Sequence, residues 1–169
     1  MKKNKVTRLA MLGVFTAVAL VLSYVESLLP PIWTAVPGIK MGLPNIIIII
    51  LLYKLGVKEA ALVSLIRVLF SSFLLFGSGM MLIYSVVGAT LSLVLMAICK
   101  KLNIFSTVGV SVVGGISHNL GQILVAIALF DTTQLGYYMI VLSVTGTIAG
   151  VFIGVAGALL LKRLEKVKM

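Results

Sequence analysis

Long apolar stretches separated by short groups of basic residues run along almost the whole chain. Hydrophobic residues make up 61% of its 169 residues and charged residues only 11%, whereas charged residues account for roughly a quarter of a typical soluble domain. A soluble fold of this length cannot bury so much apolar surface, but a lipid bilayer can cover it. The composition therefore predicts a multi-pass membrane protein with one domain over residues 1–169.

Breakers and charges divide the chain into candidate membrane-spanning helices. A helix needs about 20 apolar residues to cross the roughly 30 Å of hydrocarbon in a bilayer. The six candidate spans are residues 8–29, 42–54, 58–77, 79–99, 107–130 and 136–161. The second span is short, so we expect it to tilt little, to thin the bilayer locally or to pack inside other helices. The predicted fold class is an all-α integral membrane protein with six transmembrane helices.

Lysine and arginine are distributed unevenly over the predicted loops. Four lie before or at the start of the first span, two lie where the second span ends and the third begins, two lie between the fourth and the fifth, and four follow the sixth, which makes 12 of the 14. Only Lys40 and Arg67 lie elsewhere. The positive-inside rule places the basic face in the cytoplasm. Both termini are therefore predicted to be cytoplasmic, in a multi-pass protein of the bacterial cell membrane.

The composition also excludes several classes of function. The formal net charge of +10 follows from this topology and from contact with anionic lipids of the bilayer, so it does not indicate a nucleic-acid partner. The chain has four acidic residues, one histidine and one cysteine, Cys99, and none of these residues has the spacing of a metal site. No Walker motif is present. We therefore predict no metal site, no cofactor and no catalytic residue.

Small residues recur at helical spacing in two of the spans. Gly146, Gly150 and Gly154 form one stripe in the sixth span, and Ala10, Gly13 and Ala17 form another in the first. Membrane helices associate where small residues let their backbones come close. The stripe of the sixth span is interpreted as internal packing. The stripe of the first span serves either internal packing or contact with another membrane subunit.

One charged residue lies in the middle of a predicted span. Arg67 is about ten residues from each end of the third span, and an ionised side chain at this depth costs roughly 2.5–3.5 kcal/mol on insertion scales. Ser64 and Ser71 share its helix face because they lie three residues before it and four after it. Since arginine stays charged, Arg67 requires an anionic partner, backbone carbonyls or a bound anion.

The fifth span contains the segment "GGISHNLGQI", which holds the only histidine of the chain. His118, Asn119 and Gln122 spread over one helix face near the middle of the membrane. The neighbouring glycines are expected to leave room beside these polar side chains; they are Gly114, Gly115 and Gly121.

Further polar residues lie toward the external face. Tyr24 and Glu26 are near the outer end of the first span, and Asn45 begins the second. Together with Arg67 and the polar residues of the fifth span, they predict an outward-facing cavity for a small, largely apolar ligand with an anionic group. Two structural alternatives remain open. Arg67 and Glu26 could pair to hold two helices together, and the amides of the fifth span could be interhelical hydrogen-bond partners.

Three segments of the chain resemble a known family. They are "RLAMLGVFTAVALVLSYVE" in the first span, "MGLPNIIIIILLYKLGVKEAALVSLIRVLFSSFLLFG" across the second and third, and "GGISHNLGQI" in the fifth. On these segments the chain resembles the family labelled Gx transporter or heptaprenyl diphosphate synthase component I. That family is in turn similar to the substrate-binding S components of energy-coupling factor transporters, which have six helices and cytoplasmic termini.

The resemblance to S components implies partners and a coupling surface. S components use a small-residue motif in their first helix to contact a coupling membrane subunit, and two ATPases drive release of the substrate. Here this surface corresponds to Ala10, Gly13 and Ala17, with glycine where the family usually has alanine. This reading makes the chain a membrane subunit that captures a quinone or isoprenoid precursor from the outer face.

The other family label implies an alternative function. It describes a component of a prenyl diphosphate synthase in menaquinone biosynthesis, and such synthases bind magnesium through aspartate-rich segments. This chain has a single aspartate, Asp131. The alternative is therefore a non-catalytic membrane component of a heptaprenyl diphosphate synthase, and on either reading the chain is not itself an enzyme.

Overall fold

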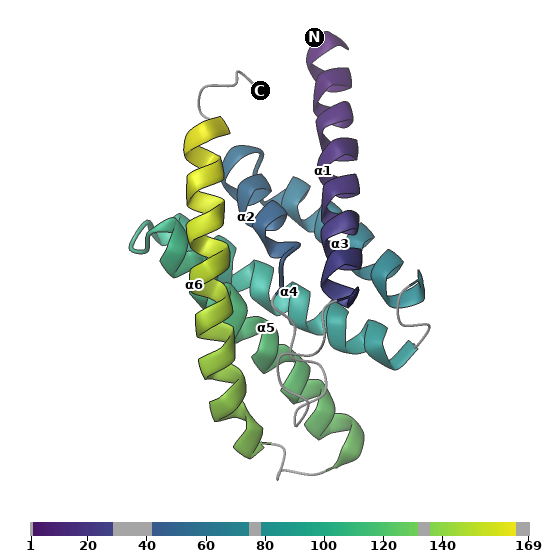
Figure 1. The fold of residues 1–169 in the computed structure, drawn as a ribbon, viewed down its shortest axis with the longest axis vertical. Coiled ribbons are helices and arrows are strands. Elements are labelled where there is room, and N and C mark those ends of the chain that lie inside the picture. The colour runs from purple at the N-terminus through teal and green to yellow at the C-terminus, as the bar shows by residue number, and fades with distance from the viewer. Residues whose placement is uncertain (1, 29–41, 75–78, 132–135, 165–169) are drawn as a thin grey trace.

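Every regular element of the structure is a helix (Figure 1). The structure is a computed structural model and describes residues 2–28, 42–74, 79–131 and 136–164. Its six helices are α1 (Lys2–Leu28), α2 (Asn45–Lys54), α3 (Val57–Leu74), α4 (Gly79–Leu102), α5 (Thr107–Phe130) and α6 (Tyr138–Leu164). The six predicted segments all correspond to helices. The predicted loop with Lys40, most of the turn before Gly79, and the basic residues Lys166 and Lys168 lie outside the described residues.

Several helix ends differ from the predicted spans: α2 begins at Asn45 rather than near residue 42, and α4 continues to Leu102 rather than ending near residue 99. α1 begins at Lys2 rather than near residue 8, and α6 continues to Leu164 rather than ending near residue 161. The sequence boundaries marked where apolar residues stop. α1, α4 and α6 continue past them because lysine and arginine are good helix formers and their charged ends can extend beyond the hydrocarbon region.

Four of the six helices are long and apolar enough to cross a membrane: α1, α4, α5 and α6. α2 has 10 residues, about 15 Å at 1.5 Å per residue, which is too short to cross roughly 30 Å of hydrocarbon. α3 has 18 residues and three charged side chains, those of Lys58, Glu59 and Arg67. Of the six predicted spans, four thus correspond to described helices that could cross a membrane by length and composition, and α2 and α3 pack among them.

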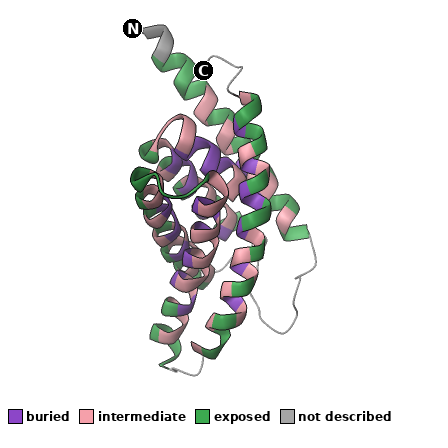
Figure 2. Cartoon of the chain, turned by 90° about the vertical axis from the view of Figure 1, so that its left-hand side faces the viewer, coloured by how far each residue is buried: buried purple, intermediate pink, exposed green. Residues whose placement is uncertain are grey.

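α2 forms the centre of the hydrophobic core. Its residues Ile47–Leu52 are all buried, and they pack with buried side chains of other helices such as Ala19, Val63, Met96 and Val110. A helix that is apolar on all sides must be surrounded by other elements or by lipid. Figure 2 shows the buried residues gathered inside the bundle, while residues 5–10 of α1 are exposed. The expectation that the second segment packs inside other helices is confirmed.

Contacts from other helices hold α2 at both ends. Gly42, which precedes it, has a φ of +73°, a backbone conformation that favours glycine, and its N–H donates to the carboxylate of Glu26 on α1. At the other end, Lys100 Nζ donates to the carbonyl oxygen of Leu52 at 2.6 Å and lies 5.1 Å from the ring centroid of Tyr53. α1 and α4 thereby fix the position of α2 along the bundle.

The glycine stripe of α6 packs against α5. A Cβ atom on Gly150 would lie 2.6 Å from the Cα of Val112, and one on Gly154 would lie 2.7 Å from the Cα of Val108. Gly146 faces Gly115 on α5 in the same way. The interpretation of this stripe as internal packing is confirmed.

The glycines of α5 bring it close to a second helix as well. A Cβ on Gly121 would lie 2.8 Å from the Cα of Gly88 on α4, and one on Gly114 would lie 2.5 Å from the Sδ of Met96. The sequence analysis expected these glycines to leave room beside polar side chains, and for these two this is wrong. Neighbouring helices fill the space because small residues let membrane helices approach closely.

The described basic helix ends gather at one end of the bundle. Arg8 on α1 forms an ion pair with Glu59 in the first turn of α3, and Lys100 binds the last turn of α2. Figure 1 shows the first turn of α1 and the last turn of α6, which carries Lys162 and Arg163, at the same end. The arrangement agrees with the distribution of basic residues along the sequence.

Candidate functional site

A polar cavity of about 80 Å³ lies among the helices and is lined by residues from all six. Six of the seven predicted ligand-binding residues line it: Glu26, Asn45, Arg67, His118, Asn119 and Gln122. The seventh, Tyr24, does not; its side chain is 54% exposed on α1. Residues 24 and 26 of a helix point about 200° apart, so only one of the two can face the cavity.

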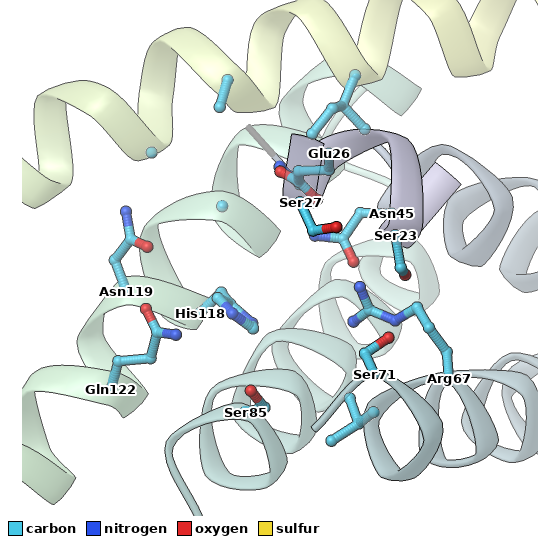
Figure 3. Close-up of a pocket in the computed structure, with 16 residues that line it drawn as sticks. Ser23, Glu26, Ser27, Asn45, Arg67, Ser71, Ser85, His118, Asn119 and Gln122 are labelled. Atoms are coloured by element: carbon cyan, nitrogen blue, oxygen red, sulfur yellow. The ribbon is translucent and has the colours of Figure 1, made fainter. Parts of the chain in front are cut away.

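Arg67 provides the positive charge of the cavity. Figure 3 shows its guanidinium extending from α3 toward His118 on α5. Its Nε is buried, and so is the Oγ of Ser71 one turn further along the same helix; neither atom has a hydrogen-bond partner among the described residues. A buried polar atom without a partner costs about 1–3 kcal/mol. These two atoms are therefore groups that an anionic or hydroxylated ligand can satisfy.

Glu26 brings a negative charge to the same cavity. Its carboxylate accepts a hydrogen bond from the backbone N–H of Gly42, and its charge acts favourably on Arg67. One arginine and one glutamate on the lining leave no large excess of positive charge. A group with a single negative charge is therefore a better fit than a highly charged one.

The polar residues of α5 have different roles. Asn119 Nδ2 donates to the carbonyl oxygen of Leu142 on α6 at 2.7 Å, so this side chain links two helices, as the structural alternative predicted. In Figure 3, Asn119 and Gln122 lie on the far side of His118 from Arg67. His118 is therefore the residue of α5 that faces the arginine.

Sequence reasoning missed several lining residues. The polar or small ones among them are Ser23, Ser27, Gly42, Ser85, Gly146 and Ala149. Ser23 lies three residues before Glu26, so helical spacing placed it on the same face and could have identified it. Ser85 on α4 has no such signal, because only the packing of α4 against α3 and α5 brings it to the cavity.

The size and lining of the cavity suit a small polar group. No set of three potential metal ligands occurs within the described ranges. Gly42 and Asn45 line the cavity where α2 begins, and the N-terminus of a helix attracts negative charge. Small-molecule sites usually enclose about 300–1,000 Å³. The polar cavity, at about 80 Å³, is smaller than this range and has room for a small head group rather than a whole ligand.

The predicted partner surface on α1 is exposed. Ala10, Gly13 and Ala17 are all exposed, and a Cβ atom on Gly13 would have no neighbour within 4 Å among the described residues. These three residues therefore do not pack against another described helix, and their surface is available to a lipid or to another protein.

Comparison with known proteins gives one family. No curated protein and no solved structure gives a significant match to the chain. A family model described as heptaprenyl diphosphate synthase component I matches residues 15–160, a range that runs from the middle of α1 to the last turns of α6 and includes every lining residue of the polar cavity. Component I is the non-catalytic component of a synthase with several subunits. The chain therefore belongs to the heptaprenyl diphosphate synthase component I family.

Proposed function

We propose that the chain is the membrane component of a heptaprenyl diphosphate synthase in menaquinone biosynthesis, and that its polar cavity binds the anionic group of a small, largely apolar compound. The family supports the first part of this proposal. The composition agrees with it, because a chain with one aspartate lacks the carboxylates that hold magnesium and diphosphate in a prenyltransferase. The catalytic site is then contributed by a soluble partner subunit.

The ligand-binding part of the proposal depends on two buried polar atoms of α3. Arg67 Nε and Ser71 Oγ are both buried without a hydrogen-bond partner among the described residues, and both residues line the same cavity. Buried polar groups in proteins are almost always hydrogen-bonded. A bound anion or hydroxyl group would satisfy both atoms at once.

The orientation in the membrane follows from the charged helix ends. We place the end that carries Arg8, Lys100 and Lys162 in the cytoplasm of a bacterial cell, in agreement with the positive-inside rule. The polar cavity then lies between the middle of the membrane and the external face. The exposed residues Lys58 and Lys101 lie at the cytoplasmic end, where a soluble synthase subunit can bind.

Co-purification from membranes tests this function. A tagged chain should recover a soluble prenyltransferase, and the variant with Lys58→Glu and Lys101→Glu should lose it by reversing two charges at the contact. Asp131→Asn, at the end of α5 away from the basic face, is the matched control and should retain the partner. Recovery of the prenyltransferase by both variants would contradict docking at these lysines, and recovery of none by the unaltered chain would contradict the proposed partner.

A second candidate function is the substrate-binding subunit of an energy-coupling factor transporter. The observation that favours it is the exposed stripe of Ala10, Gly13 and Ala17 on α1, which a coupling membrane subunit could contact. Recovery of a membrane subunit with two ATPases in the same co-purification, and its loss in Gly13→Leu, would favour the transporter over the synthase component.

A further inference from the structure

A second cavity lies between α3 and α4 and has a different chemical character from the polar cavity. Its volume is about 330 Å³, which falls in the usual range of roughly 300–1,000 Å³ for small-molecule sites. Short side chains on both helices create the space, namely those of Ala61 and Ser64 on α3 and Ala89 on α4. We refer to this cavity as the α3–α4 groove.

The α3–α4 groove is apolar and opens sideways. Of its lining residues only Ser64 and Thr90 carry a polar side chain. Its rim is exposed, with Val57 at 47%, Leu65 at 50% and Val94 at 48%, whereas Val68 and Leu93 behind it are buried. We place this apolar, exposed rim in the hydrocarbon of the bilayer, where an apolar chain can enter it without passing through water.

The groove and the polar cavity meet at one residue. Val68 lines both, and on α4 the neighbouring residues Ser85 and Val86 line the cavity and the groove respectively. α4 returns alongside α3 in the opposite direction (Figure 1). The groove therefore runs from Val57 and Val94 toward Val68, roughly 16 Å along α3 at 1.5 Å per residue, and the polar cavity begins where it ends.

We propose that the α3–α4 groove holds the hydrocarbon chain of a single-chain amphiphile whose anionic group binds beside Arg67, with Val68 at the junction of the two. The proposal rests on the proposed function, since it uses the same polar cavity, and it adds the class of ligand: an alkyl or isoprenoid chain with one small anionic head group. The charge of Arg67 selects the head group, and the apolar groove selects the tail.

The dimensions of the two cavities exclude the ordinary two-chain lipids of the bilayer as the intended occupant. The polar cavity of about 80 Å³ has no room for a phosphodiester with its glycerol. A free anion without a chain would leave the groove unused.

Binding measurements with two alkyl phosphates test the proposal. The unaltered protein in nanodiscs should bind dodecyl phosphate at least about tenfold more tightly than butyl phosphate, because the longer chain reaches the apolar groove. Ala89→Phe fills the groove, so it should remove this preference and leave butyl phosphate affinity unchanged. Ala128→Phe, on an exposed position of α5, is the matched control and should keep the preference.

A labelled probe locates the chain without altering the protein. Dodecyl phosphate with a diazirine at the end of its chain should label α3 and α4 near Val57, Ala61 or Val94, as mapped by mass spectrometry. Labelling confined to α5, α6 or α1 would overturn the proposal, and so would equal affinity for the two phosphates. Displacement of the probe by two-chain phospholipid alone would assign the groove to bilayer lipid instead.

Failure of this proposal differs from failure of the proposed function. Butyl phosphate tests the polar cavity alone: if it binds and Arg67→Ala abolishes the binding, the head-group site stands whatever the longer probe shows. If the Arg67→Ala variant binds butyl phosphate as well as the unaltered protein does, the polar cavity is not the anion site. Labelling of the groove would then show a chain-binding site that does not depend on Arg67.

Discussion

A Cβ atom on Gly150 of α6 would lie 2.6 Å from the Cα of Val112 on α5, so the two helices touch through their backbones. The contact continues along the stripe at Gly146 and Gly154. Backbone atoms cannot move aside as a flexible side chain can, which makes this helix pair the part of the fold with the least tolerance for added volume.

Gly150→Ala is therefore expected to lower the free energy of unfolding by about 1–3 kcal/mol, the usual cost of overpacking. Gly13→Ala is the matched control, because a Cβ at Gly13 meets no atom within 4 Å in the described structure and alanine has the higher helix propensity. Thermal unfolding in detergent measures both variants. Equal midpoints for the two variants would show that α5 and α6 are not in backbone contact.

Arg67→Ala is expected to weaken the binding of butyl phosphate by roughly 10–100-fold, since hydrogen bonds to a charged group contribute about 1.5–3 kcal/mol. The affinity of the Arg67→Lys variant should lie between those of the unaltered protein and Arg67→Ala, because lysine keeps the charge but not the planar set of donors of arginine. Isothermal titration in nanodiscs gives the affinities. The control is Arg8→Ala, which removes an exposed ion pair with Glu59 away from the cavity. If Arg8→Ala weakens binding as much as Arg67→Ala, the effect comes from the net charge of the protein.

Lys100→Met is expected to lower the free energy of unfolding by about 1–3 kcal/mol, because it leaves the part-buried carbonyl of Leu52 without its donor at 2.6 Å. Its neighbour Lys101 is exposed, so Lys101→Met should change stability by less than about 0.5 kcal/mol. Unfolding of the two variants under identical conditions compares them directly. Similar losses in both would mean that positive charge at this helix end, rather than the bond to α2, stabilises the protein.

Asn119→Ala and Gln122→Ala separate packing from ligand binding on α5. Asn119 donates to Leu142 on α6, and interhelical hydrogen bonds in membranes average about 0.6 kcal/mol, so its variant should lose stability by about that amount. Gln122→Ala should instead affect mainly the affinity for butyl phosphate. The free energy of unfolding and the affinity for butyl phosphate are measured for both variants. A loss of stability in Gln122→Ala but not in Asn119→Ala would mean that Gln122, rather than Asn119, holds the helices together.

The sequence predicted six residues of the polar cavity because each is an exception to a strong local rule. A charged or amide side chain within an apolar span must face another helix or a cavity, so Arg67, His118 and Gln122 could be identified one at a time. Tyr24 illustrates the limit of this approach. It is near the correct end of α1, but helical rotation turns it outward while Glu26 turns inward, and an aromatic residue at a membrane boundary is equally well placed toward lipid.

The sequence by itself determined the membrane class, the six helices and the gathering of basic residues at one set of helix ends. These properties follow from hydropathy and charge along the chain, because a bilayer requires long apolar helices regardless of how they pack. Only the tertiary structure decided which helices the glycines of α5 contact, how Ser85 reaches the polar cavity, and that Val68 lines both this cavity and the α3–α4 groove. Such relationships depend on the rotation and crossing of helices that are distant in sequence, and local periodicity does not specify either.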